Sequence, residues 1–346
     1  MFAVHCANPM SYSTPAHATL TLMADPSDAA SLRSPRIYTG VLIATLLPVV
    51  LVVGFNLTFG PVAFVVLMVA VVLTGIPHGA VDHIVAAKLY GLSSTWADQA
   101  RFYGSYLALM ALYGALWLVA PALCLWAFLA MTMYHFGQAD LAYWDLSPVR
   151  ARLLYLSRGL LLMGLPIVAH PGIVDPIFDA IAGVRPLHWA LVTEHATATL
   201  TVLVLQHGVV LGGLATSATS IPTHGWREGL NTAVLSLLFI VVHPLVAFAV
   251  YFGLWHSLGH ILELIRFFHK KGGPTTLPGF YQKAALYTGL SFVGLGVLYA
   301  ITQSFGLHNQ MIALLFILIS VMTLPHMIIV ERLYQERESE RVVASG

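Results

Sequence analysis

Ten apolar segments follow one another along the chain after its first 36 residues, and most are long enough to cross a lipid bilayer. A helix needs about 20 apolar residues to span the hydrocarbon core, where only helices and closed barrels pair every backbone polar group. The segments cover residues 37 to 55, 61 to 86, 102 to 120, 122 to 143, 152 to 170, 191 to 215, 229 to 243, 245 to 268, 281 to 303 and 308 to 331. They predict an all-α, polytopic transmembrane helix bundle of about ten helices, with a range of about 8 to 10 because the joints at Pro121 and Pro244 are tight hairpins.

The composition supports a membrane protein and excludes several other classes. Hydrophobic residues make up 58% and charged residues 9% of the 346 positions, whereas about 25% of an ordinary soluble domain is charged. The net charge is +1 and no basic cluster is interleaved with aromatic residues, so a nucleic-acid partner is excluded. Cys6 and Cys124 are the only cysteines, and neither a disulfide framework nor a thiolate metal site is expected.

The basic residues give an orientation, because positive charge is retained on the cytoplasmic side of a membrane. With both termini cytoplasmic, every lysine and arginine except Arg185 falls on that side. Arg158 lies one turn inside the fifth segment, and its side chain is expected to reach back to the interface. We therefore predict a multi-pass protein of the cell membrane. Its parts are a disordered cytoplasmic tail (1–36), a single transmembrane catalytic domain (37–335) and a second cytoplasmic tail (336–346).

Three of the segments carry histidines in polar motifs. The motifs are GIPHGAVDH from Gly75 to His83, MYHFGQAD from Met133 to Asp140 and YFGLWHSLGH from Tyr251 to His260. They lie in the second, fourth and eighth segments, which run in the same direction, so their depths can be compared. At about 1.5 Å of rise per residue, four histidines fall within a layer roughly 7 Å thick. These four are His78, His135, His256 and His260.

The four histidines favour a metal site. His256 and His260 are the most specific local pattern, because side chains at positions i and i+4 share one helix face. Pro77 is expected to open the backbone ladder beside His78. Neutral imidazoles suit iron, zinc or copper, and ligand type alone does not separate these metals. Ser257 stands where a zinc protease has glutamate, and zinc more often keeps three protein ligands and a hydrolytic water. Fe(II) with an open position for O2 is the better fit.

Further polar groups lie near these histidines. Those one turn further in are Asp82, His83, Asp140 and Glu263. They could accept the second N–H of a ligand imidazole, or they could meet water at the interface. His207 and His326, in the sixth and tenth segments, lie at similar depth and could complete the site or support it.

An apolar substrate tunnel would need aromatic and methionine side chains in its wall. The candidates beside the motifs are Met131, Met133, Tyr134, Phe136, Tyr251, Phe252 and Trp255. At helical spacing such residues are also ordinary core, so both interpretations stay open.

The three motifs resemble those of the Brp/Blh family of bacterial and archaeal beta-carotene 15,15'-dioxygenases. The family pattern is G-x-PHGxxDH, then YHFG, then WHSxxH. Its counterparts here, in the same order, are Gly75 to His83, Tyr134 to Gly137 and Trp255 to His260, with a family-like Pro325-His326 near the end.

The resemblance implies an integral-membrane enzyme with Fe(2+) as its cofactor. Such an enzyme cleaves beta-carotene at the central double bond with O2 and yields two all-trans-retinal molecules. The iron ligands proposed for the family map onto His78, His135, His256 and His260. Some relatives are linked to bacteriorhodopsin production, which implies a functional link to a retinal-binding rhodopsin.

Two other functions compete with this one. A membrane di-iron desaturase or hydroxylase also uses His-x-x-x-His pairs, but it would need more paired histidines than the one such pair found here, and a redox partner. A proton or metal-ion transporter could use the histidines as a relay, and breaks at Pro77, Pro244 and Pro325 are compatible with that. The chain has no G-x-G-x-x-G fingerprint, so a nicotinamide or flavin domain is not expected.

Overall fold

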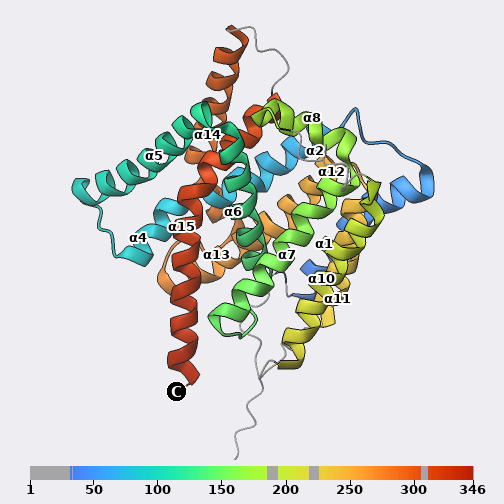
Figure 1. The fold of residues 1–346 in the computed structure, drawn as a ribbon. Helices are drawn as coiled ribbons and strands as arrows, with labels where there is room; N and C mark the ends of the chain where they lie inside the picture. Colours follow the sequence, from blue (N-terminus) through green and yellow to red (C-terminus); the bar gives the residue numbers. More distant parts are fainter. Residues whose placement is uncertain (1–31, 33, 185–193, 218–225, 305–310, 346) are drawn as a thin grey trace, which may run out of the picture.

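The computed structural model describes residues 32, 34–184, 194–217, 226–304 and 311–345, and within these residues every regular element is helical (Figure 1). The α-helices are α1 (Pro35–Phe55), α2 (Ala63–Ala70), α3 (Ile76–Gly79), α4 (Asp82–Tyr90), α5 (Trp96–Val119), α6 (Pro121–Leu141), α7 (Pro148–Ala169), α8 (Pro171–Ala182), α10 (Ala196–Ser217), α11 (Trp226–Val241), α12 (Pro244–Val250), α13 (Leu258–Lys271), α14 (Leu277–Ser304) and α15 (Met311–Ser345). Two π-helical stretches, η2 (Val71–Gly75) and η4 (Tyr251–Ser257), interrupt the series.

Within the described part of the chain, eight helices are long and apolar enough to cross a membrane, which confirms the predicted polytopic bundle at the lower end of its range. They are Pro35–Phe55, Ala63–Tyr90, Trp96–Val119, Pro148–Ala169, Ala196–Ala215, Pro244–Lys271, Leu277–Ala300 and Met311–Glu340. The other two predicted segments are also helical, as α6 and α11, and α11 has only 16 residues. Helix α8 is an addition that the sequence analysis did not separate.

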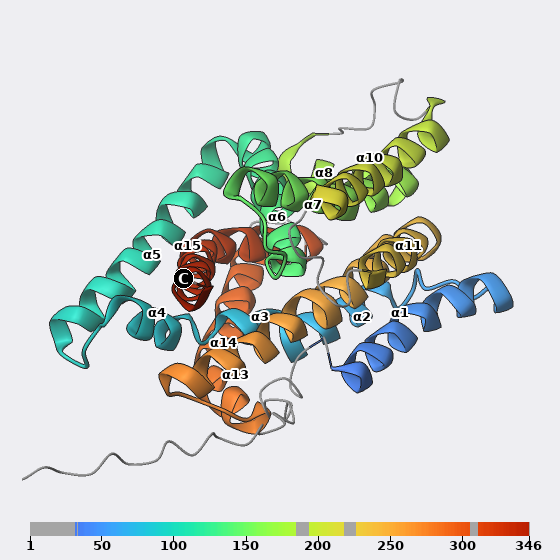
Figure 2. The ribbon, with the colours of Figure 1, turned by 90° about the horizontal axis from the view of Figure 1, so that it is seen from below.

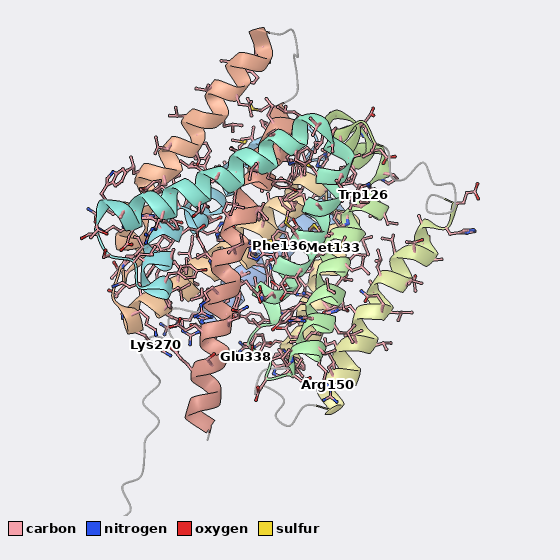
Figure 3. The ribbon with its side chains drawn as sticks, turned by 60° about the vertical axis from the view of Figure 1, so that its left-hand side comes forward. Trp126, Met133, Phe136, Arg150, Lys270 and Glu338 are labelled. Carbon is pink, nitrogen blue, oxygen red and sulfur yellow. The ribbon has the colours of Figure 1, made fainter. Side chains whose placement is uncertain are left out.

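The predicted tails are only partly covered by the structure. Residues 1–31 and 33 of the first tail lie outside the described residues, as does Arg185. At the other end, α15 continues as a helix to Ser345 and includes nearly all of the predicted second tail. Figure 3 shows the charged residues Arg150, Lys270 and Glu338 toward one end of the bundle.

Helices α6 and α7 pack backbone to backbone through two glycines. A Cβ atom on Gly137 would collide with the carbonyl oxygen of Tyr155, and one on Gly159 would collide with that of Met133. Small residues at helix interfaces permit such close approach in membrane proteins. This contact holds α6 against α7, as Figure 2 shows, and α6 also contacts α15.

The outer helices present apolar side chains to the surroundings. Leu112 and Leu118 on α5 and Leu286 and Val293 on α14 are exposed. Apolar patches of this kind on a monomer mark contact with lipid or with another protein. Their position on long apolar helices fits a lipid-facing surface.

The second predicted segment changes helix type at Pro77. The π-helical η2 ends at Gly75, and the short α3 carries Pro77 and His78. Proline has no N–H for the carbonyl four residues earlier, and here the hydroxyl of Tyr281 donates to that carbonyl, on Leu73, at 2.7 Å. The eighth segment is also interrupted, because η4 contains His256. Such π-helical stretches occur often at functional sites.

Candidate metal centre

Five imidazole rings meet in the interior of the bundle. They belong to His78 on α3, His135 on α6, His256 on η4, His260 on α13 and His326 on α15. Six pairs of these rings are in contact, with centroids from 4.9 Å apart for His135 and His256 to 5.7 Å apart for His78 and His260. All five side chains are buried. The structure therefore brings together the four histidines expected from their depth and adds His326 as a full member.

The ring nitrogens of this histidine cluster fit the donor set of a metal ion. Buried nitrogens without a hydrogen-bond partner occur on all five rings, and such atoms are costly unless something binds them. Metal–imidazole bonds of about 2.0 to 2.1 Å place two ligand rings roughly 5 Å apart. Among the described residues, however, no group of three acidic, cysteine or histidine side chains already has its donor atoms converged on one point. The rings lie close together, but their nitrogens do not point to one common position. Rotation of the side chains would be needed to direct these nitrogens to a single ion.

Asp82 orients one ring of the cluster. Both of its carboxylate oxygens lie 3.0 Å from Nδ1 of His326, which donates to them. The hydroxyl of Tyr106 donates to the same carboxylate at 3.0 Å. A carboxylate on one imidazole nitrogen fixes the tautomer and leaves the other nitrogen free to ligate. That other atom, Nε2 of His326, has no hydrogen-bond partner. Asp82 therefore contacts an imidazole of the cluster, as expected, but this imidazole belongs to His326 and not to one of the four motif histidines.

Three other predicted supporting residues have different contacts. His83 packs against the ring of Tyr287, with centroids 4.6 Å apart. Glu263 forms an ion pair with Arg337. Asp140 accepts from Arg158 at 2.9 Å, and in the low dielectric of the interior an opposite charge is a stronger partner than a neutral imidazole. We therefore assign Asp140 and Glu263 to ion pairs, which corrects the expectation that they hold ligand rings.

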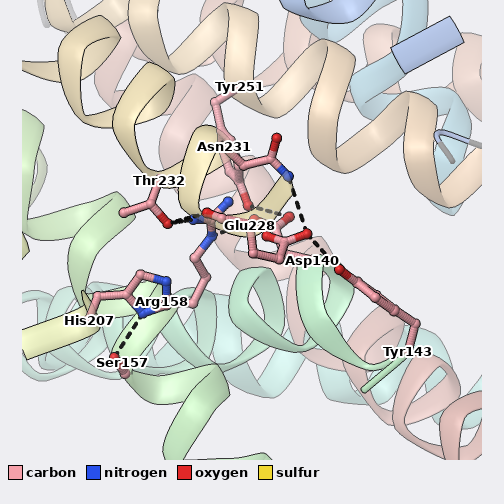
Figure 4. Close-up of polar contacts among 9 residues, drawn as sticks. All are labelled: Asp140, Tyr143, Ser157, Arg158, His207, Glu228, Asn231, Thr232 and Tyr251. Atoms are coloured by element: carbon pink, nitrogen blue, oxygen red, sulfur yellow. Dashed lines mark hydrogen bonds and ion pairs between the residues drawn. The ribbon is translucent and has the colours of Figure 1, made fainter. Parts of the chain in front are cut away.

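The expected path of Arg158 to the interface is wrong. Its side chain is 1% exposed and is held by Asp140 and by Thr232, whose hydroxyl accepts from Nη1 at 3.1 Å (Figure 4). The guanidinium group of Arg158 pairs with the buried carboxylate of Asp140, so the side chain does not extend to water. Glu228 belongs to the same network and accepts from the hydroxyl of Tyr143 at 2.7 Å. His207 lies at its edge, with Nδ1 2.9 Å from the Ser157 hydroxyl, and not in the histidine cluster.

An apolar cavity adjoins the histidine cluster. Four of the rings lie in its wall, namely His78, His135, His256 and His326. The rest of the wall is almost entirely hydrocarbon. It includes Leu129, Met163, Ile177, Leu245 and Met322, together with Phe128, Phe136, Phe178, Phe248, Phe252 and Phe316. The cavity therefore places imidazole rings directly beside an apolar space.

Comparison with known proteins decides the family. The model of the beta-carotene 15,15'-dioxygenase family matches residues 69–334. The chain belongs to this family. It is 31% identical over 287 residues to the probable beta-carotene 15,15'-dioxygenase Blh of Halobacterium salinarum, covering 76% of this chain and 82% of that one. It is 23% identical over 274 residues to a beta-carotene 15,15'-dioxygenase of an uncultured marine bacterium, covering 78% and 93%. No solved structure matches the chain.

In this member of the beta-carotene 15,15'-dioxygenase family, only some of the predicted tunnel residues line the apolar cavity. Phe136 and Phe252 line the apolar cavity as expected. Tyr134, Tyr251 and Trp255 instead donate to Glu331, Asp140 and Thr45. Aromatic side chains with a polar atom turn toward hydrogen-bond acceptors when buried. Met131 packs against a separate core cluster, and Met133 packs against the main core.

The apolar cavity is also lined by residues that the sequence did not predict, and many of them lie outside the three motifs. Phe178 lies on α8 and Phe316 on α15, and neither belongs to a polar motif. The sequence around Phe178, PGIVDPIFDAIA, lies between the fifth and sixth predicted segments and carries none of the three motifs. Its place in the cavity depends on how α8 folds back on the bundle.

Proposed function

We propose that this chain cleaves beta-carotene at its 15,15' double bond with O2 to give two all-trans-retinal molecules, with Fe(II) bound by the histidine cluster. The family membership supports the carotene cleavage. The observation that carries the rest is the shared wall between the apolar cavity and four imidazole rings. We further propose that the protein lies in the cell membrane and that its product serves a retinal-binding rhodopsin.

The ligand set proposed for the iron is His78, His135, His256 and His260, with His326 as a further donor. The bound iron would supply the oxygen chemistry. The carboxylate of Asp82 keeps the proton of His326 on Nδ1, so that Nε2 presents a lone pair to the cluster.

The apolar wall binds and positions the polyene. Transfer of hydrocarbon from water into such a cavity is favourable by about 25 cal/mol for each Å² buried. The rings of Phe136 and Phe252 lie 4.5 Å and 5.7 Å from that of His256, so a polyene lying on these phenylalanines would pass close to the histidine cluster. The same wall excludes water from the reacting bond.

Expression in a bacterium that accumulates beta-carotene tests the proposal. We expect the wild-type chain to convert carotene to retinal, measured by chromatography, and His78→Ala and His256→Ala to abolish the conversion. His269→Ala is the matched control, because His269 is exposed near the end of α13. Retinal formation that survives in both cluster variants, or carotene that stays intact in cells with well-folded wild-type protein, would contradict the proposal.

A further inference from the structure

A second cavity lies against the histidine cluster, and its wall carries charged groups that the wall of the apolar cavity lacks, so we call it the polar cavity. It is bounded by the carboxylates of Asp140, Glu228 and Glu263 and by the guanidinium groups of Arg158, Arg227 and Arg266. The formal charges of these six groups cancel. Cavities lined by charged groups in this way hold water.

The two cavities meet different rings of the cluster. His78, His135 and His326 line the apolar cavity, and His260 lines the polar cavity. His256 lines both. The buried Nδ1 atoms of His256 and His260 have no hydrogen-bond partner. The histidine cluster therefore forms the partition between an apolar and a polar compartment.

A divalent cation cannot use the apolar side to reach this partition. Removing its hydration shell in a hydrocarbon-lined space would cost many kcal/mol, because an ion without polar partners is strongly disfavoured there. The polar cavity offers oxygen acceptors along its wall, and its outer residues Arg227 and Arg266 are partly exposed. Arg227 lies at the start of α11 and Arg266 in the last part of α13.

We propose that the polar cavity is the aqueous route by which a divalent metal ion enters and leaves the histidine cluster, while the carotene occupies the apolar cavity on the other side. This inference rests on the proposed metal-binding function of the cluster. It separates two steps in space, since metal exchange would use His260 and His256 from one side and the polyene would approach from the other.

Thiol modification along α6 tests the route. In full-length protein with Cys6→Ser and Cys124→Ala as background, Ala139→Cys puts a thiol in the polar cavity, and Leu129→Cys puts one in the apolar cavity on the same helix. The reagent is a positively charged methanethiosulfonate, and modification is measured by mass spectrometry. Fe(II) uptake by the metal-free protein and Fe(II) loss to a chelator are then timed. Arg227→Cys, at the outer end of the polar cavity, is a second test position should Ala139→Cys fold poorly.

The route predicts that the reagent modifies Ala139→Cys or Arg227→Cys but leaves Leu129→Cys unmodified. The rates of iron uptake and iron loss should fall at least about tenfold in the modified protein, since the remaining path is apolar. Equal rates before and after modification, or no reaction at either polar position, would overturn the route alone. Unmodified protein that binds no iron would overturn the proposed metal centre, and the route with it.

Discussion

Nδ1 of His326 lies 3.0 Å from both oxygens of Asp82, although the two residues are 244 positions apart in the chain. The contact joins α15 to the beginning of α4 and makes the last transmembrane helix part of the histidine cluster. His326 is thereby oriented by a carboxylate in the manner of a metal-bound imidazole.

Replacing Asp82 by asparagine should weaken iron binding. The amide cannot match the charge-assisted hydrogen bonds to His326 and Tyr106, and loss of such a partner typically costs about 10- to 100-fold in metal affinity. Titration of metal-free protein with Fe(II) measures the effect. Asp145→Asn, an exposed aspartate, is the control, and equal affinity in the two variants would contradict an orienting role for Asp82.

Substituting Gly137 should destabilise the bundle. Even an alanine Cβ would collide with the backbone of Tyr155, and overpacking of this kind costs about 1–3 kcal/mol or more. The expected result is a clear fall in the thermal stability of Gly137→Ala in detergent. Gly208→Ala on α10 meets open space and should leave stability nearly unchanged. Equal melting temperatures for the two variants would show that α6 and α7 can separate freely.

A polar group in the apolar cavity should weaken carotene binding without removing iron. Phe316→Gln places an amide in the wall, and an unpaired amide in apolar surroundings costs about 1–3 kcal/mol in proteins. We expect KM for carotene to rise with iron content unchanged, while Phe316→Leu stays close to wild type. A KM that is the same in both variants would argue against carotene lying along Phe316.

Removing one partner of the buried ion pair should be worse than removing both. Arg158→Met leaves the buried Asp140 carboxylate without its cation, although Tyr251 still donates to it. Removing one partner of a buried ion pair typically costs about 3–5 kcal/mol, whereas replacing the pair with apolar residues is often neutral. The yield of monodisperse protein in size-exclusion chromatography should fall in Arg158→Met and recover in the double variant with Asp140→Leu. A double variant as poor as the single one would mean that the pair has a role beyond mutual neutralisation.

The sequence indicated which four motif histidines lie near one another, because helical rise relates position along a segment to distance along its axis, and the structure gathers these four rings. It did not predict rotation about the helix axis. The π-helical stretches η2 and η4 shift the face on which later residues lie, and the polar tips of Tyr251 and Trp255 turned toward acceptors on other helices. Arg158 was misplaced for a similar reason, since its partner Asp140 lies on a different segment. Partners that meet only through tertiary packing leave no pattern in the sequence.

The most direct test uses purified chain reconstituted with Fe(II) in detergent and supplied with beta-carotene and O2. Iron per chain is measured together with the ratio of retinal formed to carotene consumed. One iron per chain, two retinal molecules per carotene, and loss of both the metal and the activity in His256→Ala are the predicted results. Two irons per chain, or cleavage that continues after all iron is removed by a chelator, would contradict an iron centre in the histidine cluster.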